Sequence, residues 1–295
     1  MRGKIAGRRL APPGARPHHR DMDNGWPRTV LTGLCIVTCA LLGLLASRFA
    51  VGARGVVAPA LLDASAPVLA SALVFVCLAV AAAFACAIAR PINAAVALFC
   101  VGCGVAAFSM RGGTVSDAVF QGGMFRWLGF ETIAWGLFVA SVAVMIFRVG
   151  GPLPDVPNPD PEQSFTAGLL RPRALVSLAA ALAALAVLAF AMVGASKGQA
   201  IGACTLAGVA AAFGARLIAA HEQPILLFAA PCMVVGLAQL ILAGPVMGSL
   251  DARFASGSLN PILCVMPADV AAGSLCGVAI GLGWSRGLVK RDADG

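Results

Sequence analysis

The chain has 295 residues, of which 60% are apolar and only 12% are charged, and its mean hydropathy of +0.91 lies far above the range of soluble domains. This composition excludes a soluble globular protein and predicts an integral membrane protein. The net charge of +8 comes from basic residues scattered along the chain, which argues against a nucleic-acid-binding surface.

Residues 1–28 are basic, contain two of the three histidines and have no hydrophobic periodicity, which predicts a disordered N-terminal tail. The apolar run that follows, from Thr29 to Ser47, is longer than the core of about 7–15 residues in a cleavable signal peptide. We therefore expect this run to stay in the membrane as an anchor.

Eight apolar stretches approach the roughly 20 residues that a helix needs to cross a bilayer. They are residues 29–47, 66–89, 92–110, 130–148, 174–195, 199–220, 224–243 and 268–285. The stretches are too long and too continuous for the alternating strands of a membrane barrel. The sequence therefore predicts an all-α integral membrane protein with eight transmembrane helices.

The composition changes most sharply after the fourth stretch, where residues 150–163 are rich in proline and acidic side chains. Such a sequence is typical of a stiff, extended spacer. We expect a cytoplasmic linker over residues 150–173. It separates a first four-span half (29–149) from a second four-span half (174–286), which a short C-terminal tail (287–295) follows.

Basic residues predict the orientation, because short loops rich in Lys and Arg stay on the cytoplasmic side. With an even number of spans and a cytoplasmic N-terminus, 15 of the 21 Lys and Arg residues lie on the cytoplasmic side. This division predicts a multi-pass protein of the cell (inner) membrane with both termini in the cytoplasm.

The two halves share several residues at similar offsets, which predicts an internal duplication with both copies in the same orientation. The matched positions are Pro91 with Pro224, Asp117 with Asp251, Glu131 with Asp269, and Arg148 with Arg286. The competing interpretation is convergent composition in an Ala- and Gly-rich chain. If the halves are related, residues 111–123 and 247–257 are equivalent external loops, each with a short helix, and Phe120 and Phe254 turn toward the membrane or the protein interior.

The acidic residues at these positions form the candidate polar site. Glu131 and Asp269 each begin a span at the outer side, so related halves would bring them to a shared external cavity, with Asp117 and Asp251 at its rim. Two close carboxylates could hold a proton or a cation between them. The alternative is structural, since an acidic residue at a helix N-terminus stabilises the helix.

Gly273, Gly277 and Gly281 recur every four residues in the last span, a spacing that allows close helix packing. Other motifs carry less information. Cys100 and Cys103 form a CxxC inside a span, where small packing residues are expected. The GxSxG at residues 194–198 lacks a base within reach, because His221 lies at the far end of the following span. We predict no catalytic residue, no cofactor and no metal site.

The sequence favours a non-enzymatic scaffold or assembly subunit of a membrane complex. A permease-like carrier of a small solute or cation is the alternative, and a membrane-embedded enzyme is the second alternative. The expected partners are the lipid bilayer and either another membrane protein or a second copy of the chain, and no nucleic acid.

Overall fold

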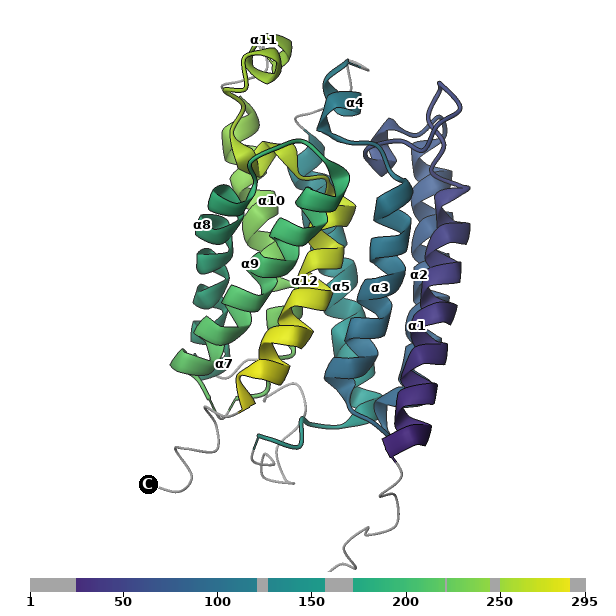
Figure 1. The fold of residues 1–295 in the computed structure, drawn as a ribbon, viewed down its shortest axis with the longest axis vertical. Helices are drawn as coiled ribbons and strands as arrows, with labels where there is room; N and C mark the ends of the chain where they lie inside the picture. Colours follow the sequence, from purple (N-terminus) through teal and green to yellow (C-terminus); the bar gives the residue numbers. More distant parts are fainter. Residues whose placement is uncertain (1–24, 121–126, 157–171, 221, 245–249, 287–295) are drawn as a thin grey trace, which may run out of the picture.

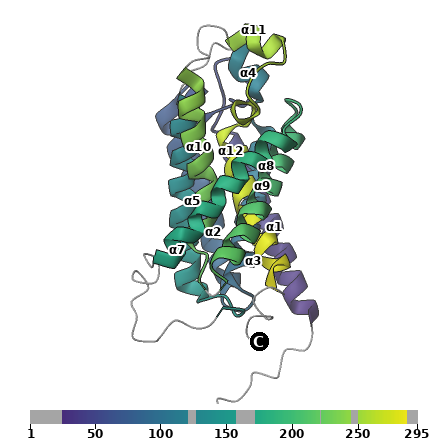
Figure 2. The ribbon, with the colours of Figure 1, turned by 90° about the vertical axis from the view of Figure 1, so that its left-hand side faces the viewer.

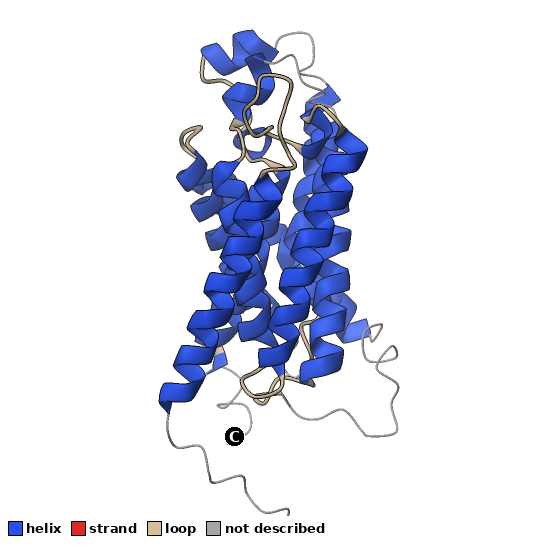
Figure 3. Cartoon of the chain, turned by 90° about the vertical axis from the view of Figure 1, so that its right-hand side faces the viewer, coloured by secondary structure: helices blue, strands red, loops and turns tan. Residues whose placement is uncertain are grey.

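The computed structural model describes residues 25–120, 127–156, 172–220, 222–244 and 250–286. These residues form helices and loops and contain no β-strand (Figure 3). The α-helices are α1 (Gly25–Ser47), α2 (Pro67–Ala89), α3 (Ala94–Arg111), α4 (Val115–Phe120), α5 (Leu128–Gly150), α7 (Pro172–Ser177), α8 (Ala181–Ala191), α9 (Lys197–Ile218), α10 (Ala230–Ala243), α11 (Leu250–Ala255) and α12 (Pro267–Trp284). Short 3-10 turns are η1 (Leu61–Asp63), η3 (Leu178–Ala180), η4 (Leu226–Phe228) and η6 (Pro261–Cys264).

The long helices stand side by side in one bundle, which Figures 1 and 2 show from two directions. The short helices α4 and α11 lie together at one end, which we call the cap end. α1 begins at Gly25 and α12 ends at Trp284 at the opposite end, which we call the tail end. Both described ends of the chain therefore lie on the same side of the bundle.

Seven helices in the described residues are long and apolar enough to cross a membrane: α1, α2, α3, α5, α9, α10 together with η4, and α12. The predicted fifth span, residues 174–195, is not one long helix. It is divided into α7, η3 and the 11-residue α8, and the chain leaves the helix after Ala191. An eighth long helix is therefore not confirmed by the described residues.

α12 is the most buried of these helices, with 83% of its apolar window inside the protein. It packs along α9 within the second half and along α3 of the first half. In the same way α5, the last helix of the first half, packs along α10 of the second half. The last helix of each half therefore lies against the other half, and the core of the bundle is shared between them.

The two predicted external loops each hold a six-residue helix, α4 and α11. The phenyl rings of Phe120 and Phe254 meet edge to face, with centroids 5.8 Å apart. The side chain of Phe120 is 62% exposed and packs on the ring of the partner loop, so an orientation of Phe120 toward the membrane stays a prediction. These two rings join the short helices of the two halves.

The described start of the predicted linker is not an extended spacer. Gly151, with a φ of +80°, ends α5 and turns the chain back toward the bundle. Leu153 and Val156 are then buried in the core, because their apolar side chains gain more by packing than by solvation. Residues 157–171 and the predicted terminal tails, apart from residues 25–28 and 286, lie outside the described residues.

Candidate functional site

A buried polar cluster lies at the cap end, where α3, α9 and α12 meet. Asp269 is 1% exposed, in the first turn of α12, and its Oδ2 accepts a hydrogen bond from the backbone N–H of Met266, 3.1 Å away. Its Oδ1 accepts from the hydroxyl of Ser109 on α3 and forms an ion pair with Lys197 of α9, at 2.9 Å. The carboxylate thus caps its own helix and holds two others.

Lys197 is the first residue of α9, and its side chain is only 11% exposed. Its Nζ donates to the carbonyl of Gly113, 2.8 Å away in the loop between α3 and α4. The ion pair with Asp269 lies inside the second half. The hydrogen bonds to Ser109 and Gly113 reach the first half. The cluster therefore fastens the two halves with two hydrogen bonds while keeping its opposite charges together.

Glu131 lies in the first turn of α5 and is 6% exposed, but its hydrogen-bond partners differ from those of Asp269. Its two carboxylate oxygens accept from the backbone N–H groups of Leu61 and Leu62, at 2.9 and 3.1 Å. The indole N–H of Trp135 lies 3.4 Å from Oε1. Glu131 thus anchors the turn η1 of the loop between α1 and α2 to the bundle.

The remaining two acids of the candidate site form no hydrogen bond or ion pair with the buried cluster. Asp117 accepts hydrogen bonds from the backbone N–H and the hydroxyl of Thr114, at 2.7 and 3.0 Å, and so caps the start of α4. Asp251 is exposed in the first turn of α11. The structure therefore gives each acid its own partners or leaves it in solvent. A cation shared between Glu131 and Asp269 stays a prediction.

A second polar contact joins the halves through α5 and α10. The hydroxyl of Thr132 donates to Gln239 Oε1, 2.6 Å away, and the amide of Gln239 donates to the carbonyls of Ile262 and Val265. Gln239 is fully buried. The α3–α12 pair and the α5–α10 pair thus each carry a buried side-chain hydrogen bond between the halves.

α3 and α12 meet along their length, and we call this contact the α3–α12 seam: Ser109, Cys103, Gly102 and Ala95 on α3, and Asp269, Leu275, Cys276 and Ala279 on α12. Its middle is tightly packed, because a Cβ at Gly102 would lie 2.7 Å from Cys276 Sγ and 2.9 Å from Leu275 Cβ. The thiols of Cys103 and Cys276 contact each other across it. At the tail end the seam opens into a cavity of about 180 Å³.

The three glycines Gly273, Gly277 and Gly281 lie where α12 meets α9. A Cβ at Gly281 would lie 2.6 Å from Ala212 Cβ, and a Cβ at Gly277 would meet the carbonyl of Thr205. The backbones of the two helices therefore approach as closely as glycine permits.

All ten cysteines are free thiols. The two cysteines of the CxxC have different neighbours, since Cys100 contacts Cys35 and Cys103 contacts Cys276. Burial raises the pKa of Cys264, which lies outside the long helices, to about 11, so this thiol keeps its proton. Among the described residues no group of three His, Cys, Asp or Glu side chains is arranged to hold a metal ion.

Ser196 of the GxSxG precedes Lys197, the first residue of α9, and this helix runs to Ile218 toward the tail end. His221 lies outside the described residues. The residue that matters structurally in this motif is therefore the lysine between the serine and the second glycine. Sequence reasoning missed Lys197, Ser109 and Gln239. The signal for Lys197 was a charged residue beginning an apolar helix on the side where basic residues are scarce.

Seven long apolar helices gathered in one bundle make the chain a multi-pass α-helical membrane protein. Comparison with protein-family models, with curated proteins and with solved structures found no match.

Proposed function

We propose that this protein is a permease-like carrier of a small solute, in which two related halves move against each other at the α3–α12 seam. One observation carries the proposal. The seam is closed at the cap end by the Asp269–Lys197–Ser109 cluster and opens at the tail end into the cavity beside Arg286. Closure at one end with an opening at the other is the arrangement that alternating access requires.

Eight crossings complete the proposed architecture, with α7, η3 and α8 as one broken crossing from the tail end. Pairing the halves in chain order matches α3 with α10 and α5 with α12. Exchanging the two halves then turns the contact of α3 with α12 into the contact of α10 with α5. The same exchange leaves the contact of α4 with α11 unchanged. Gly236 follows Gly102 by 134 positions, as Asp251 follows Asp117, and both glycines pack on the other half. This exchange supports a duplication about an axis along the membrane normal.

The tail end is the cytoplasmic side in this proposal, because most basic residues belong there. Opening the cap end would break the hydrogen bonds from Ser109 and from Lys197 to Gly113, while the ion pair stays inside the second half. No buried charge would lose its counter-ion, which would otherwise cost several kcal/mol. The cluster thus suits a gate that opens reversibly.

The test uses native cysteines and needs no known solute. A variant that keeps only Cys276, in the middle of the seam, is treated in membranes with a charged maleimide that does not cross lipid. A carrier admits water to the seam, so Cys276 is modified. The matched control keeps only Cys204, which lies on α9 against Gly273 away from the seam and stays unmodified. An unmodified Cys276 that reacts fully after denaturation would contradict the carrier.

A scaffold or assembly subunit is the second candidate, and the dense packing of α12 favours it. In that case the cavity has no transport role, and the halves keep a single arrangement. Neither candidate requires catalysis, and we propose a non-enzymatic role.

A further inference from the structure

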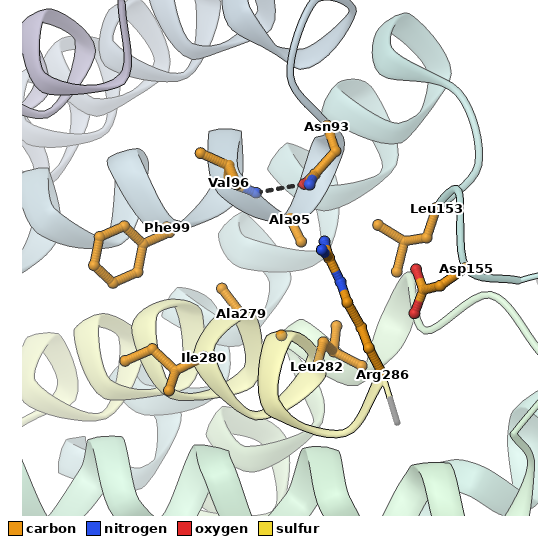
Figure 4. A pocket seen from close by; sticks show the side chains of 11 residues that line it. Asn93, Ala95, Val96, Phe99, Leu153, Asp155, Ala279, Ile280, Leu282 and Arg286 are labelled. Atoms are coloured by element: carbon orange, nitrogen blue, oxygen red, sulfur yellow. Dashed lines mark hydrogen bonds between the residues drawn. The ribbon is translucent and has the colours of Figure 1, made fainter. Parts of the chain in front are cut away.

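The cavity at the tail end lies between the start of α3, the end of α12 and the segment after α5 (Figure 4). Its volume of about 180 Å³ compares with the roughly 30 Å³ that one water molecule occupies in the liquid. Most of the lining is apolar and includes Val96, Phe99, Leu153, Ile280 and Leu282. The polar lining consists of Asn93, Asp155 and Arg286.

The cavity holds one arginine, Arg286, and one carboxylate, Asp155, whose charge is already balanced by Arg216. Arg286 extends across the cavity toward Asn93 and Ala95 (Figure 4), and it has no hydrogen bond or ion pair with a residue that the structure describes. Asp155 does not neutralise it, because the Asp155 carboxylate is paired with the buried guanidinium of Arg216, 3.0 Å away. One guanidinium therefore faces the cavity without a counter-ion among the described residues.

Asn93 adds donors to the same wall. Its Oδ1 accepts from the backbone N–H of Val96, 2.8 Å away, and so caps α3. The side-chain amide keeps both of its N–H donors, because the hydrogen bond to Val96 uses only the oxygen. The first turn of the 18-residue α3 adds the partial positive charge of a helix N-terminus beside Ala95. The polar part of the cavity thus supplies the donors of Arg286 and Asn93, and its one carboxylate, Asp155, is already paired with Arg216.

We propose that this cavity binds an oxyanion, a phosphate or carboxylate group, with Arg286 as its principal ligand. A guanidinium matches such a group with two parallel hydrogen bonds. Asn93 supplies a further donor, and the apolar lining takes the carbon part of the ligand. The same chemistry can come from a free anionic solute or from the headgroup of an acidic phospholipid in the cytoplasmic leaflet. The oxyanion site does not depend on the proposed function. Only the further step, that this anion is the transported solute, rests on it.

Binding is measured on the whole protein in nanodiscs of phosphatidylcholine, by calorimetric titration with inorganic phosphate. The second arm replaces part of that lipid with phosphatidylglycerol and records the unfolding temperature. Saturable phosphate binding identifies a free anion, and stabilisation by phosphatidylglycerol alone identifies the headgroup; both support the oxyanion site. Absence of both responses would overturn it.

Three variants locate the site. Arg286→Gln weakens binding about tenfold or more, because a charge-assisted hydrogen-bond pair is lost. Ala279→Leu fills the cavity, leaves every charge in place and also weakens binding. Arg173→Gln removes an exposed arginine of α7 outside the cavity and leaves binding unchanged. Equal binding by Arg286→Gln and the native protein would contradict the assignment.

The two proposals fail separately. If phosphate binds and Cys276 stays unmodified, the oxyanion site is supported and the carrier function is contradicted. If Cys276 is modified but neither phosphate nor phosphatidylglycerol gives a response, the carrier function is supported and the oxyanion site is contradicted.

Discussion

At the scale of single residues, the buried charged side chains that the structure describes each have polar partners. Asp269 has Lys197, Ser109 and the start of its own helix, and Arg216 has Asp155. Glu131 has two backbone amides and an indole. Taking a charge out of water costs several kcal/mol unless such partners replace the water. The positions of the charges are therefore fixed by their partners.

The ion pair at the cap end predicts strong coupling between Asp269 and Lys197. Asp269→Asn and Lys197→Met each leave one charge buried without its partner, so each should lower the free energy of unfolding by about 3–5 kcal/mol. The double variant removes both charges and should lose clearly less than the sum of the two. Unfolding in mixed micelles measures all four proteins. Additive losses would show that the two residues do not interact.

The sequence identified Asp269 and Glu131 because each acid begins an apolar span. It could not identify their partners, because Lys197 is distant along the chain and looked like part of a hydrolase motif. Whether an acid pairs with α9, with α3 or with the loop after α1 depends on how the helices pack. Packing of apolar helices in a bilayer leaves little trace in a chain this rich in Ala and Gly.

At the scale of helices, α12 owes its central position to small residues on the side that meets α9. Gly273, Gly277 and Gly281 allow the two backbones to approach, and each would place a Cβ into α9 if substituted. Gly283, on the same helix, has open space at its Cβ position. One helix therefore contains both the test positions and the control.

Gly281→Ala should destabilise the bundle, because the new Cβ would lie 2.6 Å from Ala212 Cβ and 2.9 Å from the carbonyl of Val209. Relieving such overlap costs about 1–3 kcal/mol. Gly283→Ala should be neutral or stabilising, because alanine favours a helix and meets nothing. The thermal unfolding temperature of the purified protein compares the two. Equal effects would mean that α9 and α12 are further apart than described.

Most helices agree with the predicted spans to within a few residues, since length and hydropathy determine them directly. The exception is the stretch at 174–195. Its break at Leu178–Ala180 contains neither proline nor glycine, so no local signal indicated it. The close contact of α4 with α11 was also invisible, because the matched residues of two loops do not reveal whether the loops touch.

At the scale of the whole molecule, the described ends of the chain and the loop after α5 lie at the tail end, and α4 and α11 lie at the cap end. Reporter fusions after Gly150 and after Gly295 should therefore be active on the same, cytoplasmic side. A fusion near Gly257, which follows α11, should report the outside. Opposite sides for the first two fusions would contradict an even number of crossings and two parallel halves.

The last helix of each half packs against the other half, and this arrangement also constrains the order of folding during synthesis. Thr132 is separated from its partner Gln239 by 107 positions, and Ser109 is separated from Asp269 by 160. At roughly 5–20 residues per second, α5 waits about 5–20 s in the membrane before α10 is synthesised. During that interval the Thr132 hydroxyl lacks its Gln239 partner, whereas Glu131 can already accept hydrogen bonds from Leu61 and Leu62 of the same half. These two hydrogen bonds between the halves can therefore form only after α10 and α12 are synthesised, near the end of the chain.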